Sequence, residues 1–248
     1  MTDDTTRSLA FPTLFALCGV AVLIGLGVWQ LERLRWKEGL IATLDARLAA
    51  SPVALPPPPR WPALAQANDE FRRVNFSADF IAGQEALVYA TGSALRSDVK
   101  GLGYWVFAPA RLAGGGIVLV NRGFVPADRK APDSRPQSAV DGVVDVTGLM
   151  RWPERRGLFT PDDDARGNVW YARDPAAIAA AKGWGAVAPF YIDMEAPQLA
   201  GGLPRVAPIR TIRLTNNHLQ YALTWFALAA GLAAVYLVWL FGRRRKSP

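Results

Sequence analysis

Residues 214–241, LTNNHLQYALTWFALAAGLAAVYLVWLF, decide the architecture of this chain. Residues 222–241 form a run of twenty without a charge. At about 1.5 Å per residue, such a helix crosses the roughly 30 Å of a bilayer's hydrocarbon core. The single histidine of the chain, His218, comes just before this run. The side chain that titrates near neutrality, which is also a good neutral metal ligand, is therefore predicted where a membrane helix leaves the lipid.

A second uncharged run of twenty residues lies near the N-terminus, at residues 9–28. Its apolar core is too long for a signal peptide, its basic flank is thin, and no Ala-x-Ala cleavage site follows. We interpret it as an uncleaved membrane helix. Residues 31–50 continue at helical spacing with leucines among charges, which predicts an amphipathic extension into water. Pro52 and the proline run at 56–59 end that helix and predict a stiff connector.

The middle of the chain is rich in Val, Ile, Phe, Tyr and Trp, broken by Gly, Pro, Asn and Asp. This pattern is typical of short strands, and Gly114–Gly116 suits a hairpin turn between two of them. One helix is expected at residues 175–182, closed by Gly183. Strands are expected at 71–80, 85–89, 103–109, 117–125, 143–151, 169–172, 190–194 and 209–214. We predict an α+β membrane protein, with two transmembrane helices flanking a mostly antiparallel, barrel-like β domain.

Two spans place both termini on one side of a membrane. The basic tail, with Arg243 to Lys246, puts that side in the cytoplasm, although Arg33, Arg35 and Lys37 past the first span pull the other way. The expected protein is a multi-pass protein of the bacterial inner membrane, with a periplasmic domain and lipid around its spans. The predicted organisation is a cytoplasmic N-terminus (1–8), a first span (9–29), an amphipathic helix (30–51), a proline-rich connector (52–70), a β-rich domain (71–214), a second span (215–241) and a basic tail (242–248).

Composition excludes several classes of protein. The net charge of +7 owes much to the tail beside the second span, so we read it as an anchor and expect no nucleic-acid partner. Cys18 is the single cysteine, so the chain has no disulfide of its own and no Cys-based zinc or iron–sulfur site. No nucleophile–base pair and no phosphate-binding glycine loop are present, so we expect no catalytic activity.

Five motifs occur in order along the chain. They are GVWQLERLRWK at 27–37, FRRV at 71–74, VNRGFVP at 120–126, RWPE at 151–154 with FTP at 159–161, and NNHLQYALTWF at 216–226. Between two spans, this set resembles the surfeit locus protein 1 family, the assembly factors of haem–copper cytochrome c oxidase. The likeness covers nearly the whole chain. Phe124 departs from the family, which usually has tryptophan there, but it keeps an aromatic ring.

The resemblance implies a protein that helps insert haem a into oxidase subunit I. It also implies that His218 binds the haem iron. His218, Tyr221, Ala222 and Trp225 are spaced to share one helix face, and a helix N-terminus disfavours a protonated imidazole. A haem ligated by His218 would have Tyr221 and Trp225 beside its ring, and Trp29 and Gln30 at the same depth. Its propionates would lie near four arginines, namely Arg33, Arg35, Arg210 and Arg213.

Alternatives remain open at each of these positions. His218 also fits an interfacial histidine that only contacts water or lipid headgroups, and Trp29 and Gln30 fit an ordinary interface anchor. The small pairs Ala21/Gly25 and Ala227/Gly231 would let the spans pack closely. The partners we expect are subunit I and haem a synthase, with homo-oligomers sharing a haem also open. The competing function is a cofactor-free scaffold that stabilises an oxidase assembly intermediate.

Overall fold

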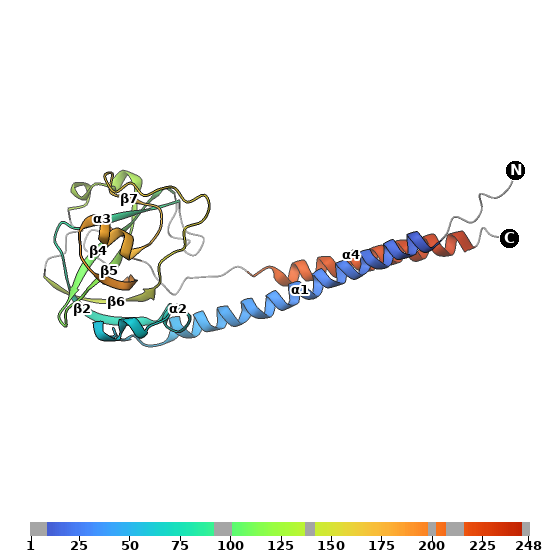
Figure 1. The fold of residues 1–248 in the computed structure, drawn as a ribbon, viewed down its shortest axis with the longest axis horizontal. Helices are drawn as coiled ribbons and strands as arrows, with labels where there is room; N and C mark the ends of the chain where they lie inside the picture. Colours follow the sequence, from blue (N-terminus) through green and yellow to red (C-terminus); the bar gives the residue numbers. More distant parts are fainter. Residues whose placement is uncertain (1–8, 92–100, 137–141, 198–201, 207–215, 245–248) are drawn as a thin grey trace. The chain divides into compact units, whose positions relative to one another are not determined.

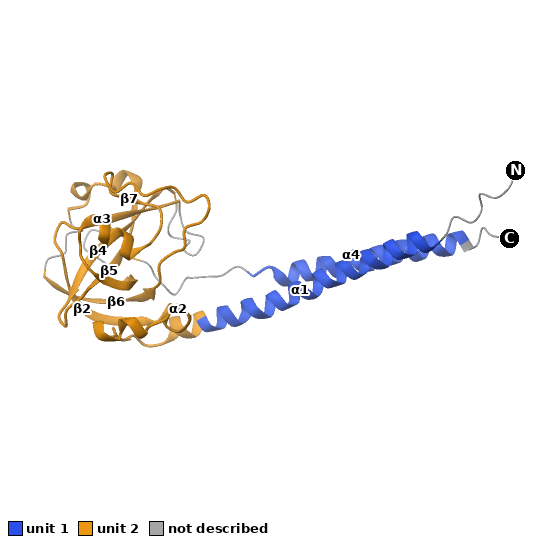
Figure 2. Cartoon of the chain, viewed as in Figure 1, with its two compact units in different colours: residues 1–43, 214–248 blue, residues 44–213 orange. Residues whose placement is uncertain are grey.

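The computed structural model describes the chain except residues 1–8, 92–100, 137–141, 198–201, 207–215 and 245–248 (Figure 1). The chain folds as two compact units (Figure 2). The helical unit contains residues 1–43 and 214–248, and the barrel unit contains residues 44–213. The predicted strand at 209–214 lies outside the described residues.

The helical unit is built from two long helices. Helix α1 (Ala10–Ala49) runs without a break for 40 residues, so the apolar and the amphipathic segments belong to one helix. Helix α4 (His218–Arg244) has 27 residues and begins at the single histidine. Both helices are long and apolar enough to cross a membrane. The last turns of α1, from Leu44 onward, belong to the barrel unit, where Leu44 and Leu48 are buried.

The barrel unit contains one eight-stranded sheet. Its strands are β1 (Val53–Ala54), β2 (Arg73–Phe80), β3 (Ala86–Ala90), β4 (Gly103–Leu112), β5 (Ile117–Pro126), β6 (Val143–Arg151), β7 (Val169–Trp170) and β8 (Val187–Ala196). Because β2 pairs with both β6 and β4, the strands β2, β6, β8, β5 and β4 form a closed ring. Closure removes the exposed edges of those strands. The α+β fold with a barrel-like sheet is thus confirmed.

Most neighbouring strands are antiparallel, as expected, but β5–β8, β1–β2 and β3–β7 are parallel. Two predicted strands were too long, for local reasons. Strand β2 begins at Arg73, because Phe71 has a left-handed backbone with φ of 63°. Strand β7 ends at Trp170, because the next N–H, that of Tyr171, donates to Asp163 Oδ1. Conversely, β4 and β8 extend beyond the predicted limits.

The predicted helix and hairpin are both present. Helix α3 (Pro175–Lys182) is capped by Asp174, whose carboxylate accepts from the N–H groups of Ala176 and Ala177. It ends at Gly183, which has a left-handed φ of 67°. The turn between β4 and β5 uses Gly115 and Gly116, with φ of 86° and 82°. At such angles a side chain is strained, which explains the glycines.

The proline-rich stretch at 52–70 is more than a stiff connector, so that expectation was wrong. It forms β1, a 3-10 helix η1 (Pro58–Ala63) and the short helix α2 (Gln66–Asp69). Trp61 of η1 is buried, with its ring edge-on to Phe190 at 5.6 Å and its indole N–H donating to Pro56 O. The large apolar ring supplies the reason: packing it against the barrel is worth more than leaving the segment extended in water.

Two large apolar clusters are described in the barrel unit, beside a smaller one around Leu87, Val106 and Val125. The first fills the ring with alternate residues of its strands, among them Val120 of β5, Phe190 and Ile192 of β8 and Met150 of β6. The second lies between α3 and the outer face of β3, β4, β5 and β8, around Phe107, Trp170 and Ile178. Because both faces of these strands are covered, β5 reads as an almost uninterrupted buried run.

Candidate functional site

The single histidine contacts a glutamine from the other helix. His218 Nδ1 and Gln30 Oε1 lie 2.7 Å apart, and Gln30 is only 9% exposed. Because an amide oxygen carries no proton, Nδ1–H donates to it, and the lone pair of the ring is on Nε2. The N–H of His218 also donates to Asn216 Oδ1 at 3.4 Å, which caps the start of α4. The imidazole is thus held in one tautomer and one orientation.

The offset of the two helices is set by close packing below this pair. A Cβ on Gly27 would stand 2.5 Å from the ring of Phe226, and one on Gly19 would stand 2.9 Å from Leu232. Thr13 Oγ1 and Tyr236 Oη share a hydrogen bond of 2.6 Å. Falling residue numbers on α1 meet rising numbers on α4, so the helices are antiparallel. Small residues permit this close approach.

The small pairs predicted from sequence are not the ones that make this contact. A Cβ at Gly25 or Gly231 would meet nothing within 4 Å, and Ala21 and Ala227 are exposed. The rotation of each helix about its own axis decides which glycines face the partner helix, and spacing along the sequence does not reveal that rotation. Gly19 and Gly27 face the partner helix, together with the buried Ala16, Ala222 and Ala229.

The other predicted ligand-binding residues are spread around the histidine. Tyr221 is 55% exposed and Trp29 is 49% exposed, while Trp225 is half-buried. Arg33 places its guanidinium 4.8 Å from the centre of the Trp36 ring. Arg210 and Arg213 lie outside the described residues. Of the predicted set, the structure joins His218 and Gln30 directly.

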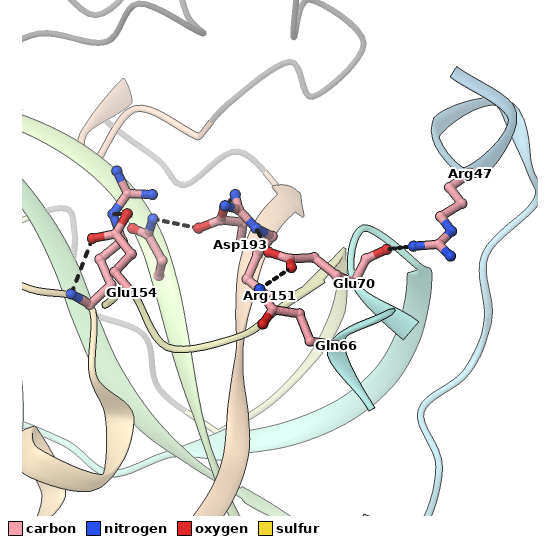
Figure 3. Close-up of polar contacts among 8 residues, drawn as sticks. Arg47, Gln66, Glu70, Arg151, Glu154 and Asp193 are labelled. Atoms are coloured by element: carbon pink, nitrogen blue, oxygen red, sulfur yellow. Dashed lines mark hydrogen bonds and ion pairs between the residues drawn. The ribbon is translucent and has the colours of Figure 1, made fainter. Parts of the chain in front are cut away.

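A second polar site, which sequence reasoning missed, lies on the barrel unit. Arg151 Nη1 donates to Asp193 Oδ2 at 2.9 Å, and its Nε donates to Glu70 Oε1 at 3.3 Å (Figure 3). Glu70 also accepts from Gln66 Nε2 at 2.6 Å, and its backbone carbonyl accepts from Arg47 Nη1 at 2.6 Å. This chain of contacts links the end of α1 to α2, β6 and β8. Only the motif arginine at 151 signalled it.

Charge pairing at this polar site is tight. Burial works against the charge of Arg151, but Tyr191, Asp193 and Glu70 outweigh it and raise the pKa of Arg151 above its ordinary value. Asn121 Nδ2 donates to the other oxygen of Asp193 at 2.7 Å. Burial raises the pKa of Tyr191 to about 12, with Asp193 adding to the effect. Its hydroxyl is fully buried and has no hydrogen-bond partner among the residues that the structure describes.

The three residues of the NRG motif, at positions 121–123, each make a specific contact near this polar site. Asn121 Oδ1 accepts from the N–H of Gly123 at 3.1 Å while its amide nitrogen binds Asp193. Gly123 has φ of 127°, and a Cβ there would overlap the carbonyl of Arg205, which pairs with Phe124. Arg122 is buried, with its guanidinium carbon 5.6 Å from the centre of the Phe80 ring.

A haem-binding role places particular demands on the donor set. No group of three or more His, Cys, Asp or Glu side chains in the described parts of the chain is arranged to hold a metal ion. A haem brings four equatorial nitrogens and needs the protein only for axial ligands. A lone imidazole fits that requirement when its Nδ1–H is hydrogen-bonded and the lone pair on Nε2 is left to ligate the iron. The residues present therefore fit haem better than a free metal ion.

Comparison with known proteins gives a consistent result. The model of the SURF1 family matches residues 17–230 of this chain. A SURF1-like protein of Monosiga brevicollis is 36% identical over 240 residues, 93% of this chain and 87% of that protein. Surfeit locus protein 1 of Mus musculus is 34% identical over 244 residues, 94% of this chain and 76% of the mouse protein. Surfeit locus protein 1 of Homo sapiens is 33% identical over 223 residues, which are 86% of this chain and 72% of the human protein. The resemblance seen in the motifs is thereby confirmed, and the chain belongs to the SURF1 family.

Proposed function

We propose that this protein is a membrane-anchored assembly factor for haem–copper cytochrome c oxidase that carries haem a as cargo for insertion into subunit I. Proteins of its family are known in general as cytochrome c oxidase assembly factors. The observation that supports the haem role is the hydrogen bond between His218 Nδ1 and Gln30 Oε1. The function is transfer of a bound group, without a reaction catalysed by the protein.

The chemistry of the pair supports this role. Gln30 fixes the tautomer and the direction of the ring, so Nε2 is ready to ligate iron without prior rearrangement. A single bond from the imidazole of His218 to the iron would suit a carrier that must release its cargo. Arg33, with Arg35, Arg210 and Arg213, would neutralise the propionates.

The proposed setting is the bacterial inner membrane. Helices α1 and α4 would cross it with both termini in the cytoplasm, and the barrel unit would be periplasmic, where it contacts subunit I or haem a synthase. The basic residues after α4 favour this orientation. An alkaline phosphatase fused after Pro248 should be inactive, and an active fusion would reverse the topology.

The visible absorption spectrum of the full chain, purified after expression beside haem a synthase, tests the haem role. The unaltered protein should carry haem a, and His218→Ala should lose at least nine-tenths of it. Gln30→Leu should retain severalfold less haem than the unaltered protein, because the ring is no longer oriented. Gln220→Leu, an exposed residue of the same helix turn, is the matched control and should retain haem fully.

Retention of haem a at unchanged stoichiometry in His218→Ala would end the haem proposal. If oxidase assembly also remained dependent on the chain, the cofactor-free scaffold would be the better description. If haem binding was lost and oxidase content was unaffected by deleting the chain, the assembly role itself would fail. The two readouts therefore separate haem binding from assembly.

A further inference from the structure

Two neighbouring apolar side chains of the barrel unit stand almost wholly in water. Leu158 is 97% exposed and Phe159 is 94% exposed, the highest values among the exposed large apolar side chains of the described residues. Covering either side chain would remove its apolar surface from water, which is favourable. The fold leaves both side chains unburied, although Leu158 directly precedes the FTP motif and Phe159 is its first residue.

The loop that presents these side chains is fixed by its own hydrogen bonds. The N–H of Thr160 donates to Gly157 O at 3.1 Å, and the N–H of Gly157 donates to Thr160 Oγ1 at 2.8 Å. Arg156 braces the loop from outside through an ion pair with Asp163 at 2.6 Å and a hydrogen bond to the carbonyl of Pro161. We call residues 157–160 the apolar tip. The hydrogen bonds between Gly157 and Thr160 hold the turn in a conformation that leaves Leu158 and Phe159 exposed.

A cavity of about 470 Å³ adjoins the tip. It is lined by Gln66, Glu70, Arg151, Trp152, Pro153, Glu154, Arg155, Thr160, Tyr171 and Ala172. Most of its charges already have partners: Glu70 pairs with Arg151, and Glu154 pairs with Arg173. Arg155 has neither an ion pair nor a hydrogen bond among the described residues. The cavity therefore offers one uncommitted cation beside two aromatic side chains.

We propose that the apolar tip and this cavity form a docking surface for an extended segment of a partner protein that carries a carboxylate next to an apolar residue. Arg155 is complementary to the carboxylate, and Leu158 and Phe159 cover the apolar residue. An anionic lipid surface would also attract Arg155 and the tip. A protein segment fits better, because a side chain can enter a cavity of this size whereas a bilayer surface only touches its rim. The inference is independent of haem binding.

Photocrosslinking of the full chain in its own membrane tests this surface. The photoreactive p-benzoylphenylalanine replaces Phe159, and mass spectrometry identifies the adduct and the crosslinked segment. The expected adduct is a protein segment with Asp or Glu beside an apolar residue. Arg155→Glu should lower its yield at least fivefold, and Arg155→Lys should preserve most of it. The matched control carries the same photoreactive residue at Val143, which is 72% exposed on β6.

Three results would overturn the proposal. These are adducts with lipid alone, equal protein adducts from positions 143 and 159, or a yield that Arg155→Glu leaves unchanged. Absence of any adduct would do the same. Haem retention is measured on the same samples, and should be normal in the Arg155 variants. A chain with Arg155 unaltered that carried no haem a but still gave the crosslink would contradict the haem role and leave the docking surface intact.

Discussion

The helical unit and the barrel unit use polar side chains in opposite ways. In the helical unit, His218–Gln30 and Thr13–Tyr236 join α1 to α4, with closely packed glycines in the stretch between. In the barrel unit, an apolar interior is accompanied by a chain of ion pairs on its outer side. The comparison teaches that the contact between the two helices depends on close packing of small residues, whereas the stability of the barrel unit depends on ion pairing as well as on close packing. Substitutions should separate these two dependences.

The largest effect is expected from Arg151→Met in the barrel unit. In the unaltered protein, Glu70 and Asp193 both pair with the guanidinium of Arg151. The substitution removes this cation and leaves both half-buried carboxylates with one cationic partner fewer. Removing one member of such a buried network costs about 3–5 kcal/mol. Denaturant unfolding of the detergent-solubilised full chain, followed by tryptophan fluorescence, measures the loss. Arg155→Met removes the same charge from an uncommitted side chain and should change the free energy of unfolding by less than about 0.5 kcal/mol. Equal losses would show that net charge, not pairing, matters.

The next effect tests space within the barrel unit. Gly123→Ala should cost about 2–4 kcal/mol, because the new Cβ overlaps the Arg205 carbonyl and φ is 127°. Gly83→Ala is the matched control, since its φ is 68° but nothing lies within 4 Å of the new Cβ. It should cost only about 1 kcal/mol, for the backbone angle alone. The same unfolding measurement applies, and a similar cost at both positions would remove the argument for close backbone approach.

A smaller effect is expected in the helical unit, where close packing replaces ion pairing. Gly27→Val should weaken the contact of α1 with α4 by about 1–3 kcal/mol, because its side chain would meet the Phe226 ring. Gly25→Val, two residues away, meets nothing within 4 Å and is the control. The readout is the rate at which a short bismaleimide joins cysteines introduced at Thr13 and Tyr236, with Cys18 replaced by Ser. The rate should fall severalfold for Gly27→Val alone. A fall in both variants would mean that the small-residue face at Gly25 also packs.

The two units also differ in how far their sequences predict them. The twenty-residue uncharged runs and the helix stop at Gly183 are local signals, so the helices and most strands followed from them. The polar site did not, because Glu70, Arg151 and Asp193 come from distant segments and meet only when the ring of strands closes. Likewise, His218 stands out in the sequence as the single histidine, but the residue that contacts it depends on the relative offset and rotation of two helices. The same uncertainty of rotation made Gly25 appear as suitable as Gly27.

The smallest effect at neutral pH is expected from Tyr191→Phe, and it reverses the usual direction. The buried hydroxyl has no partner within the described part of the chain, so its removal should raise the free energy of unfolding by about 1 kcal/mol while the ring keeps its edge contact with Phe107.

The same substitution should also change the response to alkali. Tyr191 keeps its proton up to about pH 12 in the folded chain, whereas an unfolded tyrosine loses it near 10.0. The folded state therefore binds the proton more tightly, and about 2–3 kcal/mol of stability is present below pH 10 and is lost between pH 10 and 12. Tyr191→Phe should lose less stability over this window. Burial lowers the pKa of Arg122 to about 10, which acts in the opposite direction, but it does so in both proteins and cancels in their difference. Identical alkaline profiles would mean that the hydroxyl reaches water or a partner, and the polar site would then be less sealed than its ion pairs indicate.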